Sequence, residues 1–219
     1  MNITHAVKED VTGDKLVAIF NRQKELMDKY HDIEKRSGLL QTESCPVNIN
    51  DKKGQARIKD FAWRVMEEVG EALDANVAND FEHTVEELID GLHFLTELTI
   101  LSGYTPHDVV WDNPNGNDLL LTLYCQSYCQ ADCHTSDRKI LPKLVTELVM
   151  DLGMMCNCLK NKPWKQTNMI TDVKQFLHKL RLVWNDYFAI LSLFLNPQDI
   201  VEIYFKKSQV NKFRQRSNY

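Results

Sequence analysis

The chain has 219 residues, 43% of them hydrophobic and 26% charged, which is typical of a globular protein with one large or two small domains. Its formal net charge of -5 argues against a general nucleic-acid-binding protein, which usually carries a basic surface. The N-terminal residues lack the charged start and apolar run of a signal peptide. The apolar stretches Leu119–Ala131 and Tyr187–Gln198 are too short to cross a bilayer. We therefore expect a soluble, cytoplasmic protein with neither a nucleic-acid nor a membrane partner.

Helical periodicity runs along most of the chain, and only 8 Gly and 6 Pro interrupt it. The first expected helix covers about residues 14–35, and its apolar stripe contains one amide, Gln23. The third is apolar on nearly all sides, which predicts a buried helix. Asn196 and Pro197 form a favourable start for the last helix, which should reach about Phe213. The pattern predicts an all-α helical bundle, whose remaining helices are expected at about 56–78, 81–102, 118–133, 141–159 and 171–195.

Cysteines repeat every four residues at Cys125, Cys129 and Cys133, and His134 follows directly. On a helix this spacing forms one stripe, so a zinc or iron–sulfur site is one interpretation. Structural metal sites usually contain short C-x-x-C knuckles, which are absent here. We favour reduced cysteines that pack as small apolar side chains.

Four carboxylates lie in helices that otherwise look built for burial. Glu68 and Glu71 share one helix face at spacing i, i+3, and Glu87 and Asp90 repeat that spacing on the next helix. One alternative is a pair of solvated amphipathic faces. However, burying like charges without a cation is costly. Carboxylate oxygens are the ligands that hard divalent cations prefer, so the quartet predicts a magnesium site if the helices pack antiparallel.

The last helix aligns Lys207, Asn211 and Arg214 on one face at i, i+4 and i+7. Two cations and an amide suit a polyphosphate, although alone they would more readily be interpreted as an ordinary basic surface. Beside a magnesium site they indicate phosphoryl-transfer chemistry. The buried amide of Gln23 either pairs with a core group or reads the edge of a pyrimidine, and the sequence leaves both readings open.

These motifs resemble a known family. The pattern E-x-x-E at residues 68–71, followed by E-x-x-D-x-x-H-F at residues 87–94, is similar to the all-α nucleoside triphosphate pyrophosphohydrolases. The ending Y-x-x-K-x-x-x-N-x-x-R-Q at residues 204–215, with Tyr219 following, resembles the dimeric dUTPases and the dCTPase-dUTPase of T4-like bacteriophages. The chain departs from the family pattern at Met27, Ser208 and Asn218, and the first of these bears on uracil recognition.

The resemblance implies a single domain over residues 1–219, with a catalytic core at about 14–103 and 196–219 and a helical middle insertion at about 104–195. It implies magnesium-dependent hydrolysis of dUTP, with dCTP as a further candidate, to the monophosphate and pyrophosphate. It also implies a homodimer, two or more magnesium ions and, for a phage protein, location in the host cytoplasm. Its site residues would be Glu68, Glu71, Glu87 and Asp90 for the metal, with Glu68 also acting on the attacking water, Lys207, Asn211, Arg214 and Tyr219 for the phosphates, and Gln23 for the base.

Two other functions compete with this one. A MazG-type pyrophosphatase would share the acidic helices but accept many bases. A non-catalytic helical interaction module would use the acidic face to bind a basic partner. Activity on purine nucleotides separates the first from a dUTPase, and stabilisation by magnesium separates the second.

Overall fold

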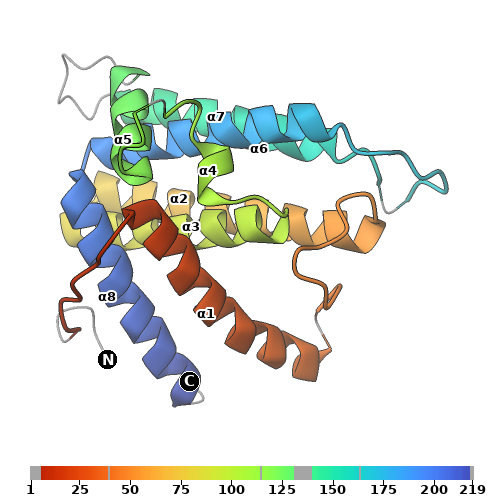
Figure 1. Ribbon diagram of the computed structural model, residues 1–219, viewed down its shortest axis with the longest axis horizontal. Coiled ribbons are helices and arrows are strands. Elements are labelled where there is room, and N and C mark those ends of the chain that lie inside the picture. Colours follow the sequence, from red (N-terminus) through yellow and green to blue (C-terminus); the bar gives the residue numbers. More distant parts are fainter. Residues whose placement is uncertain (1–5, 39, 114, 131–139, 163, 218–219) are drawn as a thin grey trace.

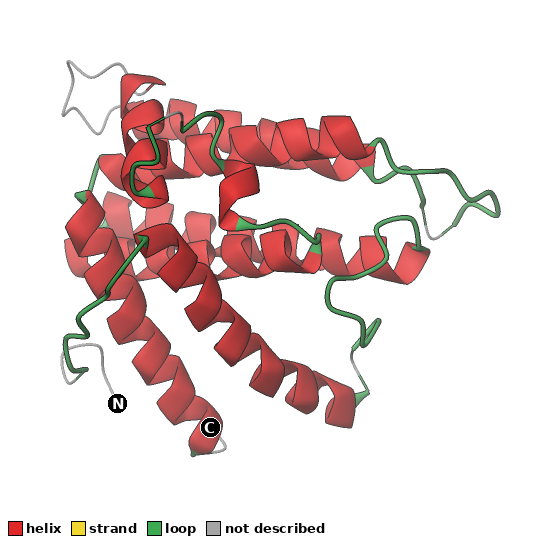
Figure 2. Ribbon diagram, in the orientation of Figure 1, coloured by secondary structure: helices red, strands yellow, loops and turns green. Residues whose placement is uncertain are grey.

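The computed structural model describes residues 6–38, 40–113, 115–130, 140–162 and 164–217. These residues form eight helices and no strand, which confirms the predicted all-α fold (Figure 2). The helices are α1 (Lys15–Ser37), α2 (Lys52–Val77), α3 (Phe81–Leu101), α4 (Pro106–Val109), α5 (Leu119–Gln130), α6 (Leu141–Cys158), α7 (Val173–Ser192) and α8 (Pro197–Arg216).

Helix ends follow local capping groups. Helix α2 begins four residues earlier than predicted because the Asp51 carboxylate accepts hydrogen bonds from the first free backbone N–H groups. The short helix α4 was not predicted, and it begins at Pro106 with a capping box before it. The predicted cap of α8 is confirmed, because the Asn196 side chain accepts two backbone hydrogen bonds. Cys133 and His134, part of the cysteine stripe, lie outside the described residues, whereas Cys125 is an exposed free thiol.

Two pairs of adjacent helices organise the molecule, and one of them, α2 with α3, runs through its middle (Figure 1). Helices α2 and α3 pack along their length and are joined by the three-residue turn 78–80, so they run antiparallel. Helices α6 and α7 form a second pair that packs against the first, while α1 and α8 cross α3 together from another side. Helix α3 therefore lies between two sets of neighbours, which explains why it is apolar on nearly all sides.

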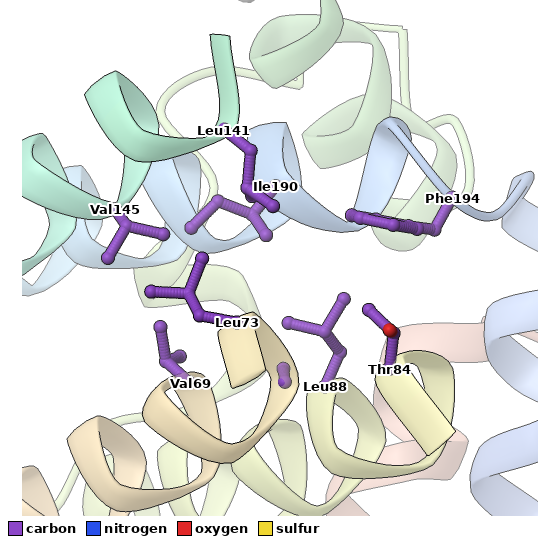
Figure 3. A pocket seen from close by; sticks show the side chains of 9 residues that line it. Val69, Leu73, Thr84, Leu88, Leu141, Val145, Ile190 and Phe194 are labelled. Atoms are coloured by element: carbon purple, nitrogen blue, oxygen red, sulfur yellow. The ribbon is translucent and has the colours of Figure 1, made fainter. Parts of the chain in front are cut away.

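The two pairs meet along an apolar seam (Figure 3). Val69 and Leu73 of α2 and Leu88 of α3 face Val145 of α6 and Ile190 of α7 across it. The space between these side chains has no room for a water molecule, so the pairs share one hydrophobic core. None of the acidic residues of α2 and α3 lines this seam, so they lie on other faces of the two helices.

Within the described residues, no single helix is long and apolar enough to span a membrane. Helices α7 and α8 meet the length and composition limits only when counted together, and they are bent by 99° at their junction.

Candidate active site

Carboxylates from α2 and α3 converge where these two helices pack against one another. One oxygen each from Glu68, Glu71 and Glu87 lie within 4.8 Å of one another. The i, i+3 spacing places the first two on one face of α2, and the antiparallel neighbour α3 supplies the third. The structure thus brings together three of the four residues predicted as metal ligands.

The charges of this cluster are not balanced by the protein. Burial, a hydrogen bond from Glu87 and the nearby Asp90 all raise the pKa of Glu68 above its ordinary value. The Glu87 Oε1 atom lies 2.7 Å from His83 Nε2, and among the described residues no Lys or Arg pairs with the three clustered glutamates. Converging carboxylates, two of them half-buried and one exposed, with a histidine as their only basic partner among the described residues, are a donor set that fits a hard divalent cation such as Mg²⁺.

The fourth predicted ligand, Asp90, contacts a lysine instead. Its Oδ2 atom lies 2.7 Å from Lys207 Nζ, which also binds Glu86 Oε1 at 2.5 Å. Lys207, predicted to bind phosphate, is 3% exposed. Burial raises the pKa of Asp90 to about 6, although the lysine opposes that rise. Asp90 and Lys207 therefore satisfy one another at the edge of the acidic cluster.

A pocket of about 270 Å³ opens where α1, α2, α3 and α8 meet. Lys207 does not line it, and Tyr219 lies outside the described residues. Glu68 is the one member of the three-glutamate cluster that also lines this pocket. The pocket thus joins residues predicted for the metal, the phosphates and the base, namely Gln23, Glu68, Asp90, Asn211 and Arg214.

Gln23 is 3% exposed and is held by three side chains. Its Oε1 atom accepts a hydrogen bond from the Tyr204 hydroxyl at 2.8 Å and lies 2.8 Å from His93 Nδ1. Burial lowers the pKa of His93 to about 3, so the ring is neutral, and its Nδ1–H donates to this oxygen. The Gln23 Nε2 atom donates to Glu97 Oε2 at 2.8 Å. Three of the four hydrogen-bonding positions of the Gln23 amide are thus occupied by core side chains, which fix its orientation at the pocket.

The sequence reasoning missed several pocket residues, among them Phe94 and Glu97. Phe94 lines the pocket with an aromatic face, and Glu97 lines it with a carboxylate whose pKa burial raises to about 7. A signal for Glu97 was available, because it is the only charged residue in the run from Leu92 to Leu101. No comparable signal separates Phe94 from the core aromatics.

A pocket that contains an arginine, an amide and a buried polar network, and that adjoins a carboxylate cluster through Glu68, fits a nucleotide-hydrolysing enzyme. A family model described as dUTPase matches residues 15–219, nearly the whole chain, so this protein belongs to the dUTPase family and is a dUTP diphosphatase. This match confirms the family predicted from the sequence. No curated protein and no solved structure matches the chain.

Proposed function

We propose that this dUTPase is a magnesium-dependent pyrophosphohydrolase that converts dUTP to dUMP and pyrophosphate, with dCTP as a second substrate. The observation that carries the proposal is the single pocket in which Glu68 and Asp90 meet Asn211 and Arg214. The chain would act as one domain, with residues 14–103 and 196–219 as its catalytic core and residues 104–195 as a helical middle section.

Magnesium would be held by Glu68, Glu71 and Glu87, with Asp90 completing a site for two or more ions. When bound, magnesium offsets charge on the phosphate oxygens and lowers the pKa of the water that it binds. Asp90 is within reach of this role because it borders both the pocket and the cluster. Its present partner Lys207 would then be released to contact a phosphate.

The protein side chains would perform the remaining steps. Glu68 lies at the junction of cluster and pocket, so it would orient the attacking water and accept its proton. The water oxygen forms a bond to the α-phosphorus while the bond from that phosphorus to the bridging oxygen breaks. Arg214 and Asn211 would bind the departing pyrophosphate and offset its growing charge, together with Lys207 and Tyr219.

The base would lie at the other end of the pocket. Gln23 would hydrogen-bond to the pyrimidine edge, and the Phe94 ring would pack on the base. A pocket of about 270 Å³ that must also admit sugar and phosphate favours pyrimidines over the larger purines. The small pocket therefore favours a dUTPase over a MazG-type enzyme.

We further propose that the enzyme is a homodimer of the cytoplasm, in a host cell if the source is a bacteriophage. The α2 side chains Trp63 and Val77 are 57% and 78% exposed, and such large apolar groups suit a subunit interface. Light scattering would test this, with twice the chain mass of 25.5 kDa expected and the single mass contradicting it.

Pyrophosphate release from dUTP, dCTP, dTTP, dATP and dGTP, each with magnesium and with EDTA, tests the proposed function. We expect magnesium-dependent release from dUTP and dCTP and negligible release from the purine nucleotides. Comparable rates on purines would favour a MazG-type enzyme. Full activity in EDTA would contradict the metal site.

A further inference from the structure

The active-site pocket contains a buried carboxylate, Glu97, to which the proposed reaction assigns no role. It follows Asp90 by seven residues on α3, which places it about 10 Å farther along the helix axis. Its side chain is only 5% exposed, yet it lines the pocket beside Gln23. Glu97 therefore lies at the end of the pocket away from the acidic cluster, where the base of a bound nucleotide would be.

Counting the hydrogen bonds shows what this end of the pocket offers to a ligand. Both acceptor positions of Gln23 Oε1 are taken by Tyr204 and His93, and one Nε2 hydrogen is donated to Glu97 Oε2. The second Nε2 hydrogen has no acceptor among the described residues. The Glu97 Oε1 atom also makes no hydrogen bond there, since His31 Nε2 lies 3.8 Å away. One amide donor and one carboxyl oxygen thus remain side by side.

Uracil and cytosine present matching groups at two neighbouring positions. Both carry an acceptor, O2, that the free N–H of Gln23 can bind. At position 3 they differ, because uracil has an N–H donor and cytosine has an unprotonated acceptor nitrogen. An ionised carboxylate accepts from the uracil N3–H, whereas a protonated carboxyl group donates to the cytosine nitrogen.

We propose that Glu97 is the specificity-determining residue of this pocket, binding N3–H of uracil when ionised and N3 of cytosine when protonated. Gln23 would bind O2 of either base, and its hydrogen bond to Glu97 Oε2 would fix the orientation of that carboxyl group. The inference rests on the proposed function, because it requires a pyrimidine base in this pocket.

The surroundings of Glu97 allow both protonation states near neutral pH. Burial raises its pKa to about 7, while the Gln23 hydrogen bond and Arg57 oppose the rise. Burial also lowers the pKa of His31 and raises those of nearby Tyr30, Tyr204 and Cys45, so these groups stay neutral around pH 7. The charged groups that act on Glu97 are Glu34 from α1 and Arg57 and Arg64 from α2, and they are paired with one another.

The test is a competition between dUTP and dCTP with magnesium, which gives the ratio of their kcat/KM values. Titration of the metal cluster affects both substrates and cancels in this ratio. For the unmodified enzyme we expect the dUTP:dCTP ratio to rise about tenfold or more between about pH 6 and about pH 8. A ratio that does not change with pH would overturn the proposal.

Glu97→Gln provides the second arm. The Gln23 N–H requires the new amide oxygen as its acceptor, so the new amide N–H faces N3 and favours cytosine. At about pH 8 we expect the ratio to fall at least about tenfold relative to the unmodified enzyme and to become independent of pH. Glu43→Gln removes an exposed carboxylate outside the pocket and should leave the ratio unchanged.

An unchanged ratio in Glu97→Gln would overturn the role of Glu97 while leaving the proposed function intact. If the unmodified enzyme released pyrophosphate from neither nucleotide, the proposed function would fail, and this inference with it. The two failures are therefore distinguished before any variant is compared.

Discussion

Adding one methyl group at Gly91 should be strongly destabilising. A Cβ atom there would lie 2.2 Å from the Tyr187 hydroxyl oxygen, at least 1.2 Å short of the 3.4 Å at which ordinary contact begins, and 3.3 Å from Glu68 Cβ. The Tyr187 hydroxyl is fully buried and donates to the Leu88 carbonyl at 2.7 Å. Gly91→Ala would therefore break a buried hydrogen bond and strain the packing of α3 against α7.

The expected cost follows from these contacts. Losing the hydrogen bond costs roughly 1–3 kcal/mol and overpacking roughly 1–3 kcal/mol, while alanine gains about 1 kcal/mol in helix propensity. We expect a net loss of about 3 kcal/mol, or a Tm roughly 6–12 °C lower, measured in EDTA by thermal and urea unfolding. Gly70→Ala in α2 is the matched control, because its Cβ would meet nothing within 4 Å, and it should be neutral or slightly stabilising.

A double variant identifies the cause. Tyr187→Phe removes the atom that clashes, so Gly91→Ala should cost only about 1 kcal/mol in that background. Equal stability of Gly91→Ala and Gly70→Ala would refute the described packing of α3 against α7. An undiminished cost in the Phe background would refute the role assigned to the hydroxyl.

Three further predictions concern the site. Lys207→Met should destabilise the metal-free protein by roughly 3 kcal/mol, because Asp90 and Glu86 would lose their shared cation, and a change below about 1 kcal/mol in urea unfolding would contradict the buried ion pair. The pKa of Glu97 is about 7 in the native state and 4.5, its ordinary value, in the unfolded chain. The free energy of unfolding should therefore fall by about 3 kcal/mol as the pH rises from about 4.5 to about 7. Glu97→Gln should lack this component in EDTA, and an identical pH profile would show that Glu97 is not so perturbed. Arg214→Ala should raise the KM for dUTP roughly tenfold without loss of stability, since Arg214 is exposed and lines the pocket. Arg216→Ala changes a residue outside the pocket and should leave the KM unchanged, so equal KM values in the two variants would remove Arg214 from the phosphate site.

Local patterns in the sequence were sufficient to predict most of the helices. Apolar periodicity located seven of the eight described helices, and the cap at Asn196 marked the start of α8 correctly. The start of α2 was misplaced because a single side chain, Asp51, extends the helix into what looks like a polar loop. Helix α4 has only four residues, too few for any periodic signal.

The site was harder to predict because it depends on contacts between distant segments. The i, i+3 spacing indicated which carboxylates share a face, but pairing of Asp90 with Lys207 depends on how α8 crosses α3. In the same way, the network around Gln23 joins residues 70 to 181 positions apart. The sequence could not predict the role proposed for Glu97, because that role depends on two groups left without partners in the fold, one N–H of Gln23 and the Oε1 atom of Glu97.

The central claim is that the carboxylates of α2 and α3 hold the magnesium used for dUTP hydrolysis. Its most direct test is pyrophosphate release from dUTP with magnesium by Glu68→Gln, compared with Glu67→Gln, which changes an exposed neighbour outside the cluster. We predict at least a roughly hundredfold loss in Glu68→Gln, with unfolding in EDTA unimpaired because a like charge is removed, and near-normal turnover in Glu67→Gln. Turnover by Glu68→Gln at the rate of the unmodified enzyme would contradict the account.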